Sequence, residues 1–449
     1  MTSPATTQAP TTLPRRHEID AIRSIALLLL IAYHVFVAFQ PFAPWVEFIG
    51  YEQTLDDAWF IGELINPWRI PVLFLISGIT AGYLLQNRSI NDLVRPRLMR
   101  LVPPLVVAVL LIAPISPALY HVSIDETPRY IPQPLHLWFV WNLVVYFLIA
   151  IPVFLYLKYR EHNVVIRTLR ACTPLGWLVF VSATLFVFSR LLEPHINADS
   201  FSIYFMRFWY GFACFICGSV LVSLGESFWT GIRWICHVAL PIAVALYVLR
   251  MMEFEYGGEN TILFARTVES VAGMLAFLGY GSLLFSRPSG FFGVLNRSVF
   301  PVYIVHLPVQ QVLAFYLFRI EMNPWTMFSL HLVGTILVSV LIYALILRPI
   351  RWLHPIFGIA PTGQAKSRVQ RTDSGDSTQK RWPTDAARIA TLYLATPILV
   401  IIAFIMQVFM LLFYTSIVDA DMSFDMDAQE QTIDHIEPAT DTGSSDDEP

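Results

Sequence analysis

The segment 21–36, AIRSIALLLLIAYHVF, decides the fold class. It is almost entirely apolar, yet Arg23 lies near one end and His34 lies deep inside. A spanning helix needs roughly 20 consecutive apolar residues, and the apolar run that begins near Ile22 is long enough. Because polar groups are costly at membrane depth, each of these two side chains needs a partner or a chemical role.

Composition extends this interpretation to the whole chain. Of its 449 residues, 56% are hydrophobic and 14% are charged, and the mean hydropathy is +0.58. Soluble proteins carry about 25% charged residues. Hydropathy therefore predicts an all-α, polytopic transmembrane bundle of about eleven spans. The predicted spans are 21–40, 67–86, 101–120, 136–157, 175–191, 204–224, 233–251, 262–286, 299–318, 326–347 and 389–416.

The loops between these spans differ in charge. If the N-terminus is cytoplasmic, the inner loops are basic and the outer loops hold only Arg129 and Arg319. This alternation predicts a multi-pass inner membrane protein with its N-terminus in the cytoplasm. No cleavage pattern follows the first apolar run, so we interpret that run as a spanning helix. An odd number of spans places the C-terminus outside.

The chain divides into five predicted parts. A cytoplasmic tail (1–20) precedes the main membrane domain (21–350), and a cytoplasmic linker (351–388) leads to an additional transmembrane helix (389–416). Residues 417–449 carry eleven acidic side chains and no Lys or Arg, which predicts a disordered tail. This tail is a possible docking segment for a basic partner. Nothing in the composition indicates a nucleic-acid partner.

The first span carries two polar groups on one face. Arg23 and His34 are eleven residues apart, which is about 20° past three helical turns and a rise of about 16 Å. One face therefore presents a cation near the cytosol and a proton-transfer group farther in. The alternative is that His34 only forms a hydrogen bond with a neighbouring helix.

Other polar residues lie toward the outer side of the predicted membrane domain. Arg69 lies near the outer end of the second span, and His136 begins the fourth. Glu269 lies about five residues inside the eighth span, where an acid indicates a functional site, although Arg266 could pair with it. His306 is mid-span between two prolines that invite a broken helix. For His136, an interfacial role beside Trp138 is equally open.

The remaining candidates lie at the middle and the inner end of the domain. Ser77 is mid-span, where a small residue can also serve helix packing. Arg95, Arg97 and Arg100 lie at the inner surface, either as positive-inside anchors or as a cradle for an anionic ligand. Cys214 and Cys217 lie in an apolar helix without further ligands, so no metal site is predicted.

These segments together resemble the acyltransferase-3 family of integral membrane acyltransferases. The similar motifs are EIDAIRSIALLLLIAYHVF, VLFLISG, RPRLMRLVPP, HLWFVWNLVVYF and FPVYIVHLPV, in this order. Within the family, the chain is most similar to the periplasmic glucan succinyltransferase branch, because of Arg69 and the Glu269-Ser270-Val271 stretch. The resemblance covers about residues 17–350.

The resemblance implies transfer of an acetyl or succinyl group from cytoplasmic acyl-coenzyme A to a hydroxyl of a glycan or glycolipid at the outer face. It implies no permanently bound cofactor. In this interpretation His34 is the base or a transient acyl carrier, assisted by Arg23 and Glu269. Coenzyme A contacts would come from Arg95, Arg97 and Arg100, and the substrate path from Arg69, Ser77, His136 and His306. The alternatives are a glycan or lipid transporter or flippase, disfavoured by the lack of a repeat, and a non-catalytic scaffold.

Overall fold

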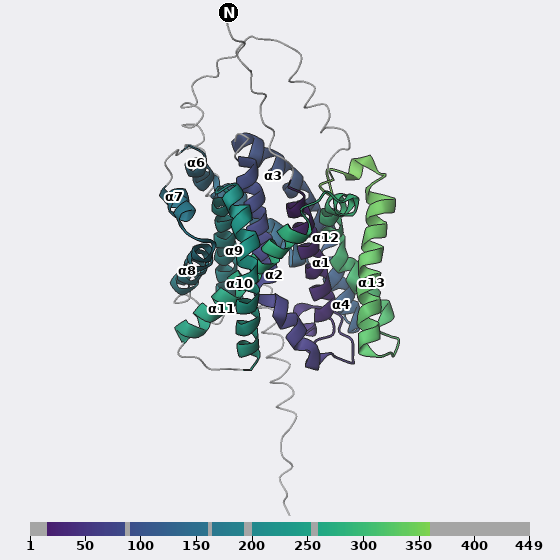
Figure 1. The fold of residues 1–449 in the computed structure, drawn as a ribbon. Helices are drawn as coiled ribbons and strands as arrows, with labels where there is room; N and C mark the ends of the chain where they lie inside the picture. Colours follow the sequence, from purple (N-terminus) through teal and green to yellow (C-terminus); the bar gives the residue numbers. More distant parts are fainter. Residues whose placement is uncertain (1–15, 86–89, 160–163, 193–199, 253–258, 360–449) are drawn as a thin grey trace, which may run out of the picture.

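In the computed structural model, residues 16–85, 90–159, 164–192, 200–252 and 259–359 are described, and they form helices and turns with no strand. The helices are α1 (His17–Val37), α2 (Trp59–Leu85), α3 (Ile90–Val107), α4 (Ile115–Ser123), α5 (Trp138–Ile149), α6 (Ile151–Tyr159), α7 (Val164–Ala171), α8 (Pro174–Leu192), α9 (Ser200–Val222), α10 (Glu226–Met251), α11 (Glu259–Leu284), α12 (Gly290–Leu317) and α13 (Pro324–Ile342). Figure 1 shows them as one bundle.

The predicted polytopic helical bundle is confirmed. Within the described residues, 8 helices are long and apolar enough to cross a membrane, and α5 and α6, bent by 50°, add a ninth as a pair. The described part of α9 is a shorter apolar helix, Arg207–Val222. Each of the first ten predicted spans coincides with a helix or a bent pair. The predicted eleventh span (389–416), most of the linker and the acidic tail lie outside the described residues.

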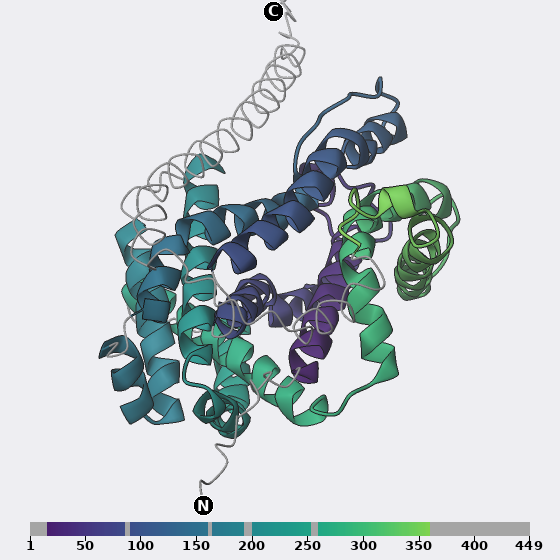
Figure 2. The same cartoon turned by 90° about the horizontal axis from the view of Figure 1, so that it is seen from above.

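Helices α1 and α2 form the centre of the bundle. Helix α1 contacts α2, α11, α12 and α13, and α2 contacts α9 and α11. Figure 2 shows the other helices arranged around this pair. The two helices run in opposite directions, so the end of α1 and the start of α2 meet at one end of the bundle. We call this end, which contains residues 38–58, the loop end; it is the lower end in Figure 1.

Close contact between α2 and α9 depends on glycine. A Cβ atom on Gly78 would lie 1.9 Å from the carbonyl oxygen of Phe215, and one on Gly218 would lie 2.2 Å from that of Leu75. The hydroxyl of Ser219 donates to the carbonyl oxygen of Gly78 at 3.0 Å. The serine-glycine pair at 77–78 therefore serves helix packing through its glycine, as small residues commonly do in membrane bundles.

Helix α12 is continuous, although it contains Pro301 and Pro308. The broken helix that these prolines were expected to cause is absent. Proline removes a backbone donor, but neighbouring groups in a membrane bundle can compensate for the loss. The continuous α12 packs against α1 and α4 and brings His306 into the centre of the bundle, where it is fully buried.

Candidate functional site

A cavity of about 680 Å³ lies at the loop end of the bundle. Helices α1, α2, α5, α9, α11 and α12 contribute to its wall, together with the loop that follows α1. Its polar and charged lining residues include Tyr33, His34, Asn66, Arg69, His136, Asn142, Arg207, Arg266 and Thr267. Aromatic and apolar side chains, among them Phe42, Phe48, Phe74, Trp138 and Leu307, line the rest. A mostly apolar pocket with a few converging polar groups is typical of a small-molecule site.

The His34 imidazole in this wall is held by a second imidazole. Its Nδ1 lies 3.0 Å from Nε2 of His306, and the two rings are nearly parallel, with an interplanar angle of 7° and centroids 5.3 Å apart. The other nitrogen of His306, Nδ1, lies 2.6 Å from the carbonyl oxygen of Tyr303. The three groups form one hydrogen-bonded chain that begins on the backbone of α12 and ends on α1.

This chain fixes the tautomers of both rings. A carbonyl oxygen can only accept, so Nδ1 of His306 carries the proton and, in the neutral ring, its Nε2 accepts. Nδ1 of His34 must then donate to His306. The proton-free nitrogen of His34 is therefore Nε2, which has no hydrogen-bond partner among the described residues. An unprotonated imidazole nitrogen in a cavity wall can act as a base.

A third imidazole completes the group. His136 Nε2 donates to the carbonyl oxygen of Ile304 at 3.2 Å, and its ring lies 4.9 Å from that of His306. The Tyr303 hydroxyl donates to the carbonyl oxygen of His136. In the sequence, His34, His136 and His306 stand out separately as polar residues within apolar segments; only the fold brings them together.

Arg69 lies in the same wall, and the fold gives it few partners. Its guanidinium lies over the ring of Tyr33, with the central carbon 3.3 Å from the ring centroid. One nitrogen donates to Oδ1 of Asn66 at 3.3 Å, whereas Nε and Nη1 are buried without a partner. Two further arginines in the wall, Arg207 and Arg266, were not predicted as site residues. Their position in the sequence could have indicated a role. Both lie near the outer ends of predicted spans, and the preference for Lys and Arg in cytoplasmic loops does not explain a cation there.

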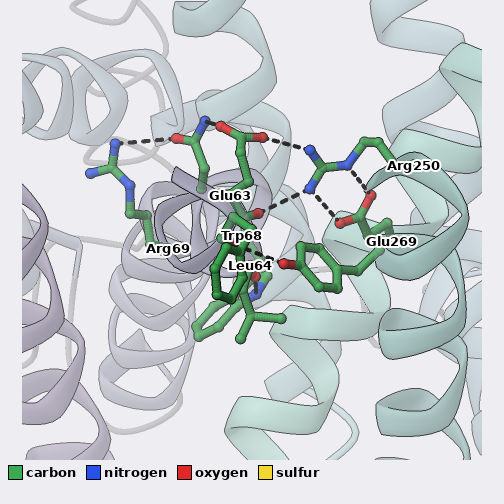
Figure 3. Close-up of polar contacts among 9 residues, drawn as sticks. Glu63, Leu64, Trp68, Arg69, Arg250 and Glu269 are labelled. Carbon is green, nitrogen blue, oxygen red and sulfur yellow. Dashed lines mark hydrogen bonds and ion pairs between the residues drawn. The ribbon is translucent and has the colours of Figure 1, made fainter. Parts of the chain in front are cut away.

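Glu269 lies outside the cavity lining, in a network shown in Figure 3. Both of its carboxylate oxygens bind Arg250, each at 2.9 Å, so its partner is Arg250 and not Arg266, the alternative that the sequence left open. Arg250 also binds the Glu63 carboxylate at 2.5 Å. Glu63 accepts from Asn66 at 2.9 Å, and Asn66 in turn contacts Arg69. Glu269 therefore reaches the cavity only through this chain, and the network ties the start of α2 to α10 and α11.

Arg23 does not line the cavity and lies toward the opposite end of α1. Helix α1 is continuous, so the Cα atoms of Arg23 and His34 are separated by about 16 Å along its axis. The guanidinium of Arg23 donates to the Thr80 hydroxyl of α2 at 2.6 Å. Ser77, one turn earlier on α2, is half-buried and also outside the cavity lining.

The three arginines of α3 lie at the end of the bundle opposite the loop end. Arg95 is exposed. Arg97 stacks over Phe147, with its guanidinium carbon 4.7 Å from the ring centroid. Nε of Arg100 donates to the carbonyl oxygen of Gly358 at 2.9 Å, and part of its side chain stays exposed. Of the three, Arg95 and Arg100 are the more accessible to a ligand at this surface.

The site and fold are those of an integral membrane protein with a half-buried histidine facing a cavity. The profile of the acyltransferase-3 family, described as an acyltransferase domain, matches residues 16–344. The chain therefore belongs to this family, and its apolar helices fit a membrane acyltransferase. No curated protein and no solved structure shows significant similarity to the chain.

Proposed function

We propose that the protein is an O-acyltransferase that moves an acetyl or succinyl group from acyl-coenzyme A to a hydroxyl of a glycan or glycolipid. The observation that carries this proposal is the His34–His306 pair. It leaves one proton-accepting nitrogen, Nε2 of His34, in the wall of a cavity large enough for a small substrate. Family membership supplies the reaction class, and this nitrogen supplies a base for it.

In the proposed step, Nε2 of His34 takes the proton of the acceptor hydroxyl. The hydroxyl oxygen attacks the thioester carbonyl carbon, the carbon–sulfur bond breaks, and coenzyme A leaves as a thiolate that can recover the proton. The positive charge that develops on His34 is shared with His306, because their hydrogen bond strengthens when the donor ring becomes cationic. A transient acyl-His34 is the variant of this mechanism in which Nε2 itself attacks the thioester.

The proposed topology assigns the two substrates to opposite ends of the bundle. With the N-terminus in the cytoplasm of a cell with an inner membrane, the loop end faces outward and receives the acceptor. The arginines of α3 then face the cytoplasm, where Arg95 and Arg100 would contact the phosphates of coenzyme A. Arg23, bound to Thr80 between these ends, would line the path of the thioester. If the chain belongs to the glucan succinyltransferase branch of the family, the acyl group is succinyl.

Glu269 and the remaining candidates take supporting roles in this proposal. Glu269 binds Arg250, which binds Glu63. We therefore propose that Glu269 helps to position Arg69 and does not contact the reacting atoms. His136 borders the acceptor side of the cavity. Ser77 is adjacent to Gly78, the glycine that allows α2 and α9 to approach closely. In this proposal Ser77 lines the substrate path between the donor end and the acceptor end of the bundle.

The test is acyl transfer by full-length protein purified in detergent, with radiolabelled acetyl-coenzyme A or succinyl-coenzyme A and glycans extracted from a deletion strain. We expect His34→Ala to lower turnover by about 10²- to 10⁴-fold, the usual contribution of a general base. His331→Gln is the control for loss of an imidazole, because His331 is a buried histidine that binds the carbonyl oxygen of Gln310 outside the cavity lining. Activity of His34→Ala above about a tenth of wild type contradicts the proposed role.

Two measurements separate this proposal from its alternatives. A transporter or flippase would move the glycan or lipid without consuming acyl-coenzyme A, so binding and consumption of the donor by purified protein distinguish the two. A scaffold would depend on its tail, so deletion of residues 417–449 would abolish its function. An acyltransferase with its chemistry in the bundle would keep its turnover after this deletion.

A further inference from the structure

Three arginines from three helices converge on the cavity. Arg69 comes from α2, Arg207 from α9 and Arg266 from α11. Arg207 lies close enough to Arg69 for their charges to repel. No carboxylate occurs among the described residues that line this cavity. Like charges are costly to hold together in a partly dehydrated space unless an anion joins them.

Arg69 is the residue of this group that most requires a partner. Its side chain is buried, with 8% of the residue exposed, yet Nε and Nη1 lack hydrogen bonds. A buried charged donor without an acceptor carries an unfavourable desolvation cost. Arg69 also lines the cavity, and a planar guanidinium matches the oxygens of a carboxylate or a phosphate.

The nearby acidic network does not balance these charges. Glu63 and Glu269 together neutralise Arg250 and leave one net negative charge; Glu63 attracts Arg69 electrostatically, and the hydrogen bonds between the two run through Asn66. Arg207 and Arg266 are exposed at the cavity, and neither has an ion-pair partner among the described residues. Within the described part of the chain, at least two positive charges at the cavity therefore have no counter-ion there.

We infer that Arg69, Arg207 and Arg266 form a binding site for an anionic group, a carboxylate or phosphate, carried by one of the two substrates. This inference rests on the proposed acyl transfer for the identity of those substrates. The anion can belong to the donor, as the free carboxylate of a dicarboxylic acyl group, or to the acceptor, as a phosphate of a glycan or glycolipid. In either case the anchored anion holds its substrate beside His34, which lines the same cavity.

The anion site is tested first without catalysis. Full-length protein in detergent is heated with succinate or inorganic phosphate, and with neutral succinamide at matched ionic strength. We expect both anions, and not succinamide, to raise the melting temperature of the wild type. The Arg69→Gln variant should lose this response, and so should the Arg207→Gln/Arg266→Gln double variant. The double variant keeps the test valid if Arg69→Gln does not fold, because both of its side chains are exposed.

Arg129→Gln is the matched control for loss of a positive charge outside the cavity. Its side chain is 51% exposed and pairs with Glu126. It should retain the full response to both anions. Wild-type protein that transfers acyl groups but responds to neither anion would overturn the anion site while leaving the proposed function intact. A response that survives in the Arg69 and double variants would overturn it as well.

Turnover then identifies the source of the anion. Succinyl-coenzyme A and butyryl-coenzyme A have four-carbon acyl chains that end in a carboxylate and a methyl group. If the donor carries the anion, wild type should prefer succinyl-coenzyme A by about tenfold to a hundredfold, and Arg69→Gln should remove the preference. If the acceptor carries it, the preference will instead be for a phosphorylated over an unphosphorylated glycan. Equal use of the two donors, together with equal use of the two acceptors, contradicts the anion site. Arg69 would then serve to stabilise the oxyanion that forms transiently during acyl transfer.

Discussion

His34 and His306 are joined by a hydrogen bond of 3.0 Å between Nδ1 of the first and Nε2 of the second. Their separation of 272 positions in the sequence places this contact beyond any local sequence pattern. Because His306 is itself held by the carbonyl oxygen of Tyr303, the pair has one arrangement of protons and one accepting nitrogen, Nε2 of His34. Substitutions at His34 and His306 therefore test the roles of individual ring nitrogens.

Replacing His306 should impair turnover more than substrate binding. We expect His306→Ala to lower kcat by about 100-fold with little change in KM, because His34 loses the acceptor that fixes its tautomer. His306→Gln should recover part of this loss, since an amide oxygen near the Nε2 position can still accept from His34. Steady-state kinetics in detergent measure both parameters. Equal kcat values for the Ala and Gln variants would show that His306 acts only through packing.

The Arg250 network should contribute to stability as well as to site geometry. Its three side chains are 4–15% exposed, so Arg250→Met leaves two largely buried carboxylates without a counter-ion. We expect a loss of about 3–5 kcal/mol in the free energy of unfolding. Chemical denaturation followed by tryptophan fluorescence measures it.

Glu269→Gln tests the role of the acid in this network. The amide oxygen can still accept from Arg250, so we expect a smaller stability loss than for Arg250→Met and a kcat within about tenfold of wild type. The KM of the substrate that Arg69 binds should rise more than kcat falls. A loss of kcat as large as that of His34→Ala would instead place Glu269 among the reacting groups.

The α2–α9 contact should not tolerate a side chain at position 78. In Gly78→Ala the added Cβ would overlap a backbone oxygen that cannot rotate away, so the helices must separate. We expect a melting temperature at least several degrees lower, or no folded protein in detergent extracts. Gly290→Ala is the control, because nothing lies within 4 Å of its added Cβ. Equal melting temperatures for the two variants would contradict the close packing.

The donor end should respond to the charge of α3. We expect Arg95→Gln to raise the KM for acyl-coenzyme A about fivefold to tenfold without changing the KM for the acceptor, since an exposed arginine contributes a charge-assisted phosphate contact. Arg170→Gln, an exposed arginine on α7, should leave both KM values unchanged. If Arg95→Gln instead raised only the KM for the acceptor, the acceptor would bind at the α3 end and acyl-coenzyme A at the loop end, the reverse of the proposal.

The sequence by itself determined the class of structure and the residues worth following. Long apolar runs have few solutions in a lipid bilayer, because their backbone groups must be satisfied within the segment, so a helical bundle followed from composition and hydropathy. The cost of polar groups at depth marked Arg23, His34, Arg69, His136, Glu269 and His306. The motif order indicated the family, which the match over residues 16–344 confirmed.

Only the tertiary structure decided which of these residues act together. Helix geometry placed Arg23 and His34 on one face of the first span, but only the fold shows that each binds a different helix: Arg23 binds α2 and His34 binds α12. Glu269 was expected in the site and instead binds Arg250, whereas Arg207 and Arg266 line the cavity without having been predicted there. Helix periodicity fixes the direction of a side chain on its own helix. The partner it meets depends on how helices from distant parts of the chain pack, which no local pattern encodes.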